Sequence, residues 1–510
     1  MSSANFGERP ESRDHLAALF NNLAAVRAVV AAVGGTLGPQ GLDCMLVDQG
    51  GRVMVTNDGV TILKHMDASH PAARMIVNIA KAQDEEIGDG TTTATVIAGG
   101  LLEEAANSAA KGVPVFRIIQ GIRWGLSKLQ TGLNRFTESI NDPGDPRLRQ
   151  LAVIAARGHE DLAELVVDAA CVVGKAKLAE PGFKLSDCIL AMEGMENRVS
   201  KGVVIGKEPM HRQMPREISR PKVLVIDDEL APEEIEPDAL ATESGFRHYL
   251  RIREELAEKL AALVDEGVGL VLADRTIFPR AEQLFIDKGV VAVQRVSNRE
   301  LLRAAELSGA TAVKKAALSR PLPECIKYLG RADRAIVDDK RQLIHILNEA
   351  ENLITICLGA STTEVLEERE RMAVDAASSV QAALNGGIVP GGGAVEVLLA
   401  RELAGKLKEL GGLPAYGAGS LVEALKRPAA QIAANAGFNP LEKIEEIWNS
   451  PLAAPGLDCE TGGIIDVLAK GILDPAAVKL HAIRSACEVA ESVLRISSVI
   501  KMKPADAGGG

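Results

Sequence analysis

The order of helical and β-rich patterns along the chain constrains the fold more than any single motif does. Helical patterns fill both outer thirds of the 510 residues, whereas short β-rich runs alternate with helices in the middle. The clearest runs are 223–226, 269–272, 290–293 and 353–358. Alternating strands and helices are typical of an α/β layer. The sequence therefore predicts an α/β domain inserted into a loop of a mainly helical domain.

Composition excludes several classes of protein. The hydrophobic fraction of 47% and the charged fraction of 25% are typical of a globular chain. Aromatic residues make up 3%, which favours helices and mixed layers built from small aliphatic side chains, and the net charge of −12 argues against a general affinity for nucleic acid. The seven cysteines form no CxxC pair, and the first residues lack a secretory pattern. No uninterrupted apolar run reaches about 18 residues, so we expect a cytoplasmic protein without a membrane-spanning helix, disulfide framework or zinc site.

Local signals organise the first third of the chain. Helical spacing predicts helices over 13–33, 72–87 and 91–111. Two short β-type runs, 44–48 and 52–56, flank a glycine-containing turn and predict a hairpin.

Three glycine-rich segments could let a phosphate approach the backbone, and none is a Walker A loop or a dinucleotide fingerprint. They are Gly34 to Gly41, Gly88 to Thr93 and Gly391 to Gly393. The second joins two predicted helices, so the later helix would present free N–H groups and the positive end of its dipole to an anion. Asp89 would repel a phosphate unless a cation such as Mg²⁺ lay between them. The alternative is a plain helix–helix turn with a Thr or Asp cap.

Asp58 and Asp375 are further acidic candidates. Asp58 belongs to an Asn-Asp-Gly turn signal, and Asp375 lies among small apolar residues on a predicted helix. Taken singly, each is explained by a turn or by an exposed helix position. A phosphoryl-transfer site needs a metal ligand and a group that orients water, and Asp58, Asp89 and Asp375 would supply these if folding brought them together.

Several motifs, taken in order, resemble those of chaperonins over nearly the whole chain. The wording of the Asn-Asp-Gly and His-Pro-Ala-Ala segments is similar to that of group II chaperonins such as the thermosome, a lineage that includes the bacterial group III members. The matching segments are Thr36 to Pro39, Val55 to Leu63, His70 to Ala73, Gly88 to Thr93, Ile388 to Ala394 and Gly471 to Pro475.

The resemblance implies a multidomain α/β chaperonin fold with three domains. A mainly helical equatorial domain would come from both chain ends, a small intermediate hinge domain from two flanking pieces, and an inserted α/β apical domain from the middle. The expected pieces are 1–138 and 391–510 (equatorial, with a disordered tail over 504–510), 139–204 and 357–390 (intermediate), and 205–356 (apical, with a helical protrusion near 229–256).

The resemblance also implies roles for individual residues. Asp58 and Asp375 would position and activate water, Asp89 would bind Mg²⁺, and Gly392 and Asp474 would contact the nucleoside of ATP. The residues expected to bind the phosphates are Thr36, Leu37, Gly38, Pro39, Asp89, Gly90, Thr91, Thr92 and Thr93.

Two segments depart from the family pattern. Gln40 stands where family members usually carry Lys or Arg after the Gly-Pro of the first loop. Arg157-Gly158-His159 stands where the intermediate domain usually offers a nucleotide-sensing Thr-Gly-Lys. These differences leave ATP hydrolysis intact and change how phosphate would be sensed.

The acidic, proline-bounded segment near 229–256 has two interpretations. It is either a solvated surface helix or, as the resemblance implies, a helical protrusion that forms a built-in lid, so that no separate co-chaperonin is needed. Client contacts are expected on exposed apolar side chains of the apical domain, with the helix 299–307 as a candidate.

The function expected from the resemblance is ATP-driven folding of non-native polypeptides. The partners would be client proteins and further copies of the chain, in two stacked rings of about eight subunits with cyclic symmetry. Nucleic acid and membranes are not expected as partners. Two other classes remain open: an ATPase or small-molecule kinase of unrelated role, and a non-catalytic ring scaffold.

Overall fold

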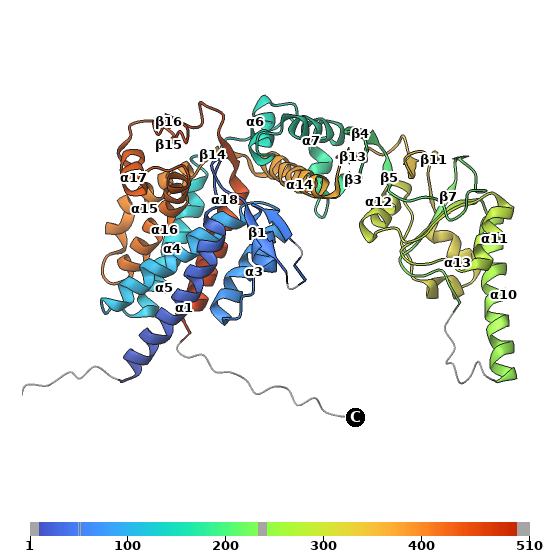
Figure 1. The fold of residues 1–510 in the computed structure, drawn as a ribbon, viewed down its shortest axis with the longest axis horizontal. Helices are drawn as coiled ribbons and strands as arrows, with labels where there is room; N and C mark the ends of the chain where they lie inside the picture. The colour runs from blue at the N-terminus through green and yellow to red at the C-terminus, as the bar shows by residue number, and fades with distance from the viewer. Residues whose placement is uncertain (1–9, 49, 52, 233–241, 497–510) are drawn as a thin grey trace, which may run out of the picture. The chain divides into compact units, whose positions relative to one another are not determined.

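The computed structural model describes residues 10–48, 50–51, 53–232 and 242–496. Within them, the chain divides into two compact units (Figure 1). Unit 1 comprises residues up to 167, 178–181 and those from 372 onward, and unit 2 comprises residues 168–177 and 182–371. The three-domain boundaries expected from the sequence remain a prediction.

Unit 1 is mainly helical, and its few strands are short (Figure 1). Its helices are α1 (Pro10–Gly34), α2 (Gly59–His65), α3 (Pro71–Glu86), α4 (Thr91–Ala110), α5 (Val115–Leu133), α6 (Pro146–Ala155), α15 (Ala394–Leu410), α16 (Pro414–Asn435), α17 (Pro440–Asn449) and α18 (Ala476–Leu494). Its strands form three antiparallel pairs: β1 (Cys44–Val47) with β2 (Val53–Thr56), β14 (Ile388–Pro390) with β17 (Leu473–Pro475), and β15 (Pro455–Leu457) with β16 (Ile464–Asp466). Residues of both units belong to α7 (Glu160–Val173), α8 (Lys175–Leu178) and α14 (Thr363–Gly386).

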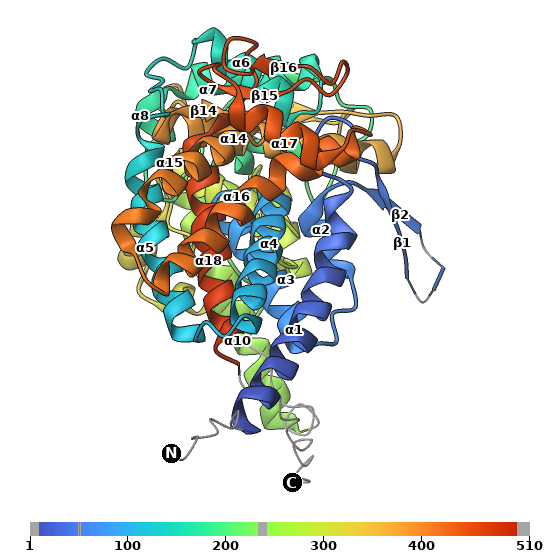
Figure 2. The same ribbon diagram turned by 90° about the vertical axis from the view of Figure 1, so that its left-hand side faces the viewer.

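Helix α4 forms the centre of unit 1 (Figure 2). It is rich in small and apolar residues, most of which are buried, at Thr91, from Thr93 through Leu102 and at Ala105, Ala106, Ser108 and Ala109. Two adjacent glycines permit close approach: a Cβ added at Gly99 would lie 2.4 Å from Val30 Cγ2 of α1, and one at Gly100 would lie 2.6 Å from Arg427 Cγ of α16. The middle of α4 is therefore packed closely against α1 and α16.

Among the described residues, one helix is long and apolar enough to cross a membrane by length and composition. It is α1, over Leu16–Gly34. One face of it, which includes Leu19, Leu23 and Val26, belongs to the core of unit 1. The polar Arg27 on the same helix donates to Glu103 of α4. About 33% of this apolar window is buried, and that part packs into the core of unit 1.

The predicted hairpin is confirmed and projects from the helices of unit 1 (Figure 2). Its strands carry large apolar side chains that are exposed, with Met45 at 64%, Val47 at 62% and Val55 at 51%. Exposed apolar side chains that gather on one element are typical of surfaces that make contacts with other molecules.

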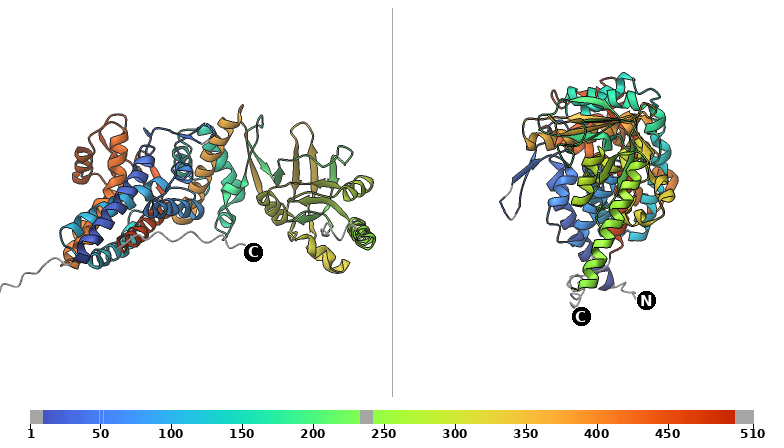
Figure 3. Two further views of the ribbon diagram at one scale, coloured as in Figure 1. Left: turned by 60° about the horizontal axis from the view of Figure 1, so that its bottom comes forward. Right: turned by 90° about the vertical axis from the view of Figure 1, so that its right-hand side faces the viewer.

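Unit 2 contains the predicted β-rich runs as strands, arranged in three sheets (Figures 1 and 3). One sheet has the order β10-β7-β8-β9, in which β7, β8 and β9 are parallel; the second is the antiparallel sheet β5-β12-β11-β6; the third is β3-β13-β4. The strands are β3 (Ile189–Ala191), β4 (Arg198–Lys201), β5 (Val203–Ile205), β6 (Glu217–Ser219), β7 (Lys222–Ile226), β8 (Val268–Ala273), β9 (Val291–Val293), β10 (Gly330–Arg331), β11 (Arg334–Asp338), β12 (Leu343–Leu347) and β13 (Ile354–Leu358). The helices are α10 (Glu243–Asp265), α11 (Pro279–Lys288), α12 (Asn298–Ser308) and α13 (Leu322–Cys325), with 3₁₀ turns at Leu185–Cys188, Lys315–Ser319 and Ile326–Tyr328.

The segment expected to form a protrusion is described in part. Residues 233–241 lie outside the described residues, and α10 follows them. The buried side chains of α10 are Leu260 and Leu263, near its end, while Phe246 and Leu250 near its start are 52% and 45% exposed. The first part of α10 is thus a solvent-exposed helix.

The expectation that α12 presents an apolar face for clients is not supported. Leu301 and Leu307 are buried against the sheets of unit 2, at 0% and 1% exposure, while Leu302 is 53% exposed. The sequence pattern identified apolar residues on this helix, but most of them pack into the core.

Candidate functional site

The predicted phosphate loops and three predicted acidic residues line one polar cavity of unit 1. The volume of the cavity is about 140 Å³, below the roughly 300–1,000 Å³ of a pocket that encloses a whole small molecule. Its size therefore fits the phosphate end of a nucleotide. The lining residues are Thr36, Leu37, Gly38, Asn57, Asp58, Gly59, Asp84, Gly88, Asp89, Gly90, Thr91, Thr92, Thr93, Arg157 and Asp375.

The first loop, Thr36 to Gly38, follows directly from the end of α1. The backbone N–H and the hydroxyl of Thr36 both donate to the Val33 carbonyl, at 3.0 and 2.8 Å. Gly38 has a φ of +88°, and a Cβ there would lie 3.1 Å from Ile432 Cγ1 of α16. A glycine is therefore required both by the backbone conformation and by the neighbouring helix.

Asp58 caps α2 and borders the cavity at the same time. Its Oδ1 accepts from the N–H of Val60 at 3.2 Å, and its Oδ2 accepts from the N–H and the hydroxyl of Thr61 at 3.0 and 2.5 Å. The turn interpretation of this residue is thus correct and does not compete with the site interpretation, because the capping bonds that the structure adds hold the carboxylate at the cavity wall.

The second loop exposes the N-terminus of α4 to the cavity. Gly88 and Gly90 have φ values of +77° and +79°, and a Cβ at Gly90 would lie 2.6 Å from Val478 Cγ1. Gly90 is the N-cap residue and provides no side-chain cap. The first N–H groups of α4 are consequently left for solvent or a ligand, and with the helix dipole they favour an anion.

Asp89 and Asp375 form the electrostatic centre of the site. The Asp89 carboxylate accepts from the Gly90 N–H at 2.5 Å and from the Ser379 hydroxyl of α14 at 2.8 Å. Burial, followed by repulsion from Asp474, raises the pKa of Asp89 above its usual range. Burial and the negative charges of Asp89 and Asp58 raise the pKa of Asp375 well above its usual range. A divalent cation between these groups would reverse this repulsion.

Three predicted residues that the structure describes, Pro39, Gly392 and Asp474, lie outside the lining of the cavity. Asp474 is in β17, which pairs with β14, and a Cβ at Gly391 would lie 3.2 Å from Asp474 Cγ. The structure thus brings Asp474 and the Gly391–Gly393 segment together beside the cavity.

A buried lysine neutralises Asp474. The Lys479 ammonium lies 2.8 Å from Asp474 Oδ2 and 2.9 Å from Glu396 Oε1, and Glu396 is 0% exposed. Burial lowers the pKa of Lys479, but attraction to Asp474 and Glu396 outweighs this effect and raises the pKa overall. The ammonium therefore stays charged.

Three further residues that no sequence pattern predicted line the cavity, namely Asn57, Asp84 and Arg157. Asn57 precedes Asp58 in the same turn, which is the signal that could have identified it. Asp84 is in α3 and pairs with Lys64 at 2.9 Å. Arg157 has a positive φ of 54° after the end of α6, and its charge opposes the raised pKa of Asp375. Arg157 belongs to a segment that departs from the family pattern. This marked the residue as unusual but did not predict that it lines the cavity.

The residues of the cavity fit a magnesium–nucleotide. Within the described chain, the buried Oδ1 of Asn57 has no hydrogen-bond partner, so the cavity wall contains an acceptor that a ligand or a bound water would satisfy. Among the described residues there is no group of three or more His, Cys, Asp or Glu side chains that could hold a metal by themselves. Mg²⁺ commonly uses one or two carboxylates together with phosphates and water, and Asp89 with this wall fits that mode of binding.

The comparison with known proteins identifies the family. The profile of the TCP-1/cpn60 chaperonin family matches residues 29–504. The chain belongs to this family, and it is a chaperonin of the group II-like lineage.

Its relatives fall in two branches of that lineage. The chain is 33% identical to the thermosome subunit of Methanopyrus kandleri, covering 94% of this chain and 91% of the relative, and 33% identical to thermosome subunit 1 of Haloferax volcanii, covering 94% and 88%. The crystal structure of a group III chaperonin in the open state superposes with a TM-score of 0.83 at 42% identity, covering 96% of this chain and 100% of that chain. The chain shares the multidomain chaperonin fold of that structure.

Proposed function

We propose that this chain is an ATP-dependent chaperonin subunit that hydrolyses ATP with Mg²⁺ and uses hydrolysis to enclose and fold non-native polypeptides. The observation that carries the proposal is the meeting of Asp58, Asp89 and Asp375 at the N-terminus of α4, in a chain of the chaperonin family. Family membership supports ATP use, and the geometry of the cavity supports hydrolysis at this site.

Different residues of the chain bind the phosphates, hold the metal and activate the water. The loop Thr36 to Pro39 and the residues Gly90 to Thr93 bind the phosphates through backbone N–H groups and hydroxyls. Asp89 holds the metal, which when bound would neutralise charge on the phosphates. Asp58 and Asp375 orient the attacking water and accept its proton. Gly392 and Asp474 contact the nucleoside beside the cavity.

Asp58 and Asp375 suit different parts of this work. Asp58 is fixed by three capping hydrogen bonds, which favours orienting water. The raised pKa of Asp375 makes it a stronger base than an ordinary aspartate, which favours proton acceptance.

The assembly that we propose is two stacked rings of identical subunits, about eight in each by family analogy. The exposed apolar side chains of the β1–β2 hairpin support contacts between copies of the chain. The proposed domains are those expected from the sequence, with a lid near 229–256 that removes the need for a separate co-chaperonin. A cytoplasmic location accompanies this role.

The test compares ATP turnover and ring closure in the wild type with those of Asp58→Ala and Asp375→Ala. Loss of a group that orients or deprotonates water lowers turnover by about 10²–10⁴-fold. Glu445→Ala, which changes an exposed carboxylate of α17 in the same unit, serves as the control and should leave turnover unchanged.

Each competing class predicts another result. A non-catalytic scaffold forms rings without turnover in the wild type, and a small-molecule kinase turns over ATP appreciably only with its acceptor. Negative-stain images with and without nucleotide report assembly and closure in the same samples. Turnover that neither Asp variant changes would remove the catalytic assignment.

A further inference from the structure

We propose that Asn435, the last residue of α16, is a positioning residue for the phosphate loop Thr36 to Gly38, acting through backbone carbonyls without touching the nucleotide. The proposal rests on the proposed binding of phosphate by that loop. Asn435 does not line the cavity as described, so its effect would pass through the loop.

Two hydrogen bonds carry the proposal. The Asn435 Nδ2 group donates to the Gly34 carbonyl at 2.9 Å and to the Leu37 carbonyl at 2.8 Å. The Gln431 side-chain amide donates to Asn435 Oδ1 at 2.9 Å, which fixes the amide with its donors toward the loop. One side chain thus satisfies carbonyls at the end of α1 and within the loop.

The same end of α16 also contacts the loop through packing. A Cβ at Gly38 would lie 3.1 Å from Ile432 Cγ1, and a Cβ at Gly34 would lie 3.3 Å from Gln431 Cδ. Contacts from Gln431, Ile432 and Asn435 therefore span the segment from Gly34 to Gly38. The position of this loop depends on the last turn of α16 as well as on its own sequence.

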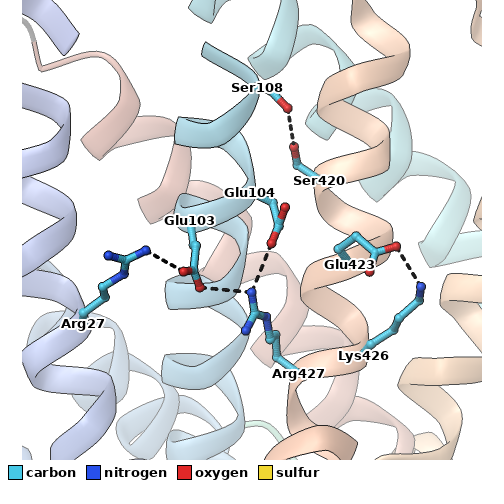
Figure 4. Close-up of polar contacts among 8 residues, drawn as sticks. All are labelled: Arg27, Glu103, Glu104, Ser108, Ser420, Glu423, Lys426 and Arg427. Atoms are coloured by element: carbon cyan, nitrogen blue, oxygen red, sulfur yellow. Dashed lines mark hydrogen bonds and ion pairs between the residues drawn. The ribbon is translucent and has the colours of Figure 1, made fainter. Parts of the chain in front are cut away.

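The face of α16 that holds this loop also contacts α4 (Figure 4). Arg427 lies two turns before Asn435, and residues spaced by four share one helix face. Its Nη2 donates to Glu103 and Glu104 of α4 at 3.0 and 3.1 Å, and Arg27 of α1 donates to Glu103 at 2.5 Å. Helix α16 thereby connects α1, which ends in the first phosphate loop, to α4, which begins at the second.

This arrangement sets the separation of the two phosphate loops. Misplacement of a binding group by about 1 Å can cost on the order of 10²-fold in rate or affinity. Loss of the Asn435 donors leaves two carbonyls without these partners and frees the first loop to shift, while the second loop keeps its own contacts with α14.

The experiment measures the dissociation constants of MgATP and MgADP and the steady-state constants for Asn435→Ala and Asn435→Asp. Asn435→Asp keeps the shape and the Oδ1 acceptor but replaces both N–H donors with a second oxygen. We expect both variants to raise the dissociation constants and KM by about 10–100-fold, with kcat changed by less than about threefold. Asn449→Ala, an exposed asparagine at the end of α17, is the matched control and should stay within about twofold of the wild type.

A second measurement is independent of nucleotide. Hydrogen exchange of the backbone amides from 36 to 42 in the free protein should become faster in Asn435→Asp, while that of α4 stays unchanged. Unchanged affinity and exchange in folded, ring-forming variants would overturn the positioning role. A merely structural role would instead reduce the folded fraction and apparent kcat at constant KM. Failure of the wild type to bind nucleotide would overturn the proposed function itself, so the two failures are distinguishable.

Discussion

Two groups of carboxylates lie close together in unit 1, and their charges are balanced in opposite ways. Asp89 and Asp375 are buried and both have raised pKa values, with repulsion from Asp474 adding to burial at Asp89 and repulsion from Asp89 and Asp58 adding to it at Asp375. Asp474 and Glu396 share the ammonium of Lys479, at 2.8 and 2.9 Å. The first group stores repulsion that a cation would relieve, whereas the second already contains a cation, which offsets one of its two negative charges.

The difference in charge balance distinguishes a functional site from the structural ion pair beside it. Repulsion and burial that raise a pKa in a cavity are typical of functional groups, and proteins retain them at a cost in stability. A buried ion pair in which each charge is balanced by its partner is typical of a structural element. Loss of one partner leaves the other charge buried without a counter-charge. Gly90 lies where the groups meet, beside Asp89 in the chain and against Val478, the neighbour of Lys479.

The largest effect is expected from Lys479→Met. This change leaves two carboxylates, one of them fully buried, without their cation, and it should lower the stability of unit 1 by about 3–5 kcal/mol. Both tryptophans of the chain, Trp124 and Trp448, are in unit 1, so their fluorescence reports its denaturation midpoint. The double variant Lys479→Met with Glu396→Met should recover part of the loss, and a single variant as stable as the wild type would show that the second group is not structural.

A smaller effect is expected from Gly90→Ala. The alanine takes an unfavourable positive φ, worth about 1–2 kcal/mol, and its Cβ meets Val478 Cγ1 at 2.6 Å, an overpacking worth about 1–3 kcal/mol more. Gly112→Ala is the matched control, because Gly112 has a φ of +91° with no atom within 4 Å of an added Cβ. Equal losses in the two variants would mean that the junction between the groups tolerates a side chain.

The smallest effect has the opposite sign. Asp375→Asn removes a charge that the folded state disfavours and should stabilise unit 1 at neutral pH by about 1 kcal/mol. The pKa of Asp375 is raised in the folded state. The wild type therefore loses stability as the pH rises from 3.8, the ordinary pKa of an aspartate, toward the pKa of Asp375 in the folded state. The gain should therefore be present at neutral pH and vanish near pH 3.8, and Asp142→Asn, at an exposed loop position, should show no such gain. A loss of stability, or a gain that does not depend on pH, would contradict the repulsion.

Local features of the fold were predictable, and long-range ones were not. The hairpin, the ends of α3 and α4 and the turn at Asp58 follow from turn residues and spacing within a few positions. The meeting of Asp375 with Asp89 depends on how α14 packs near α4, which no local pattern specifies, and resemblance to the family supplied it. For helix α12, no sequence pattern showed that Leu301 and Leu307 pack against the sheets while Leu302 stays exposed.

In the site, too, local features were predictable from the sequence and long-range contacts were not. The positive φ values at Gly88 and Gly90 were readable as a glycine loop, but the Lys479–Glu396 pair joins helices far apart in sequence and has no motif. Arg157 was noticed as an unusual residue, yet its entry into the cavity depends on the turn after α6.

The hydrogen bond from Asn435 to Leu37 joins residues 398 positions apart. During synthesis at about 5–20 residues per second, the partner of the first loop leaves the ribosome roughly 20–80 s after the loop itself. For that interval the nascent N-terminal helices lack α15, α16 and α18, against which much of their apolar surface packs. Apolar surface of the emerging first third that these helices cover in the finished fold therefore has no partner until the last third of the chain is made.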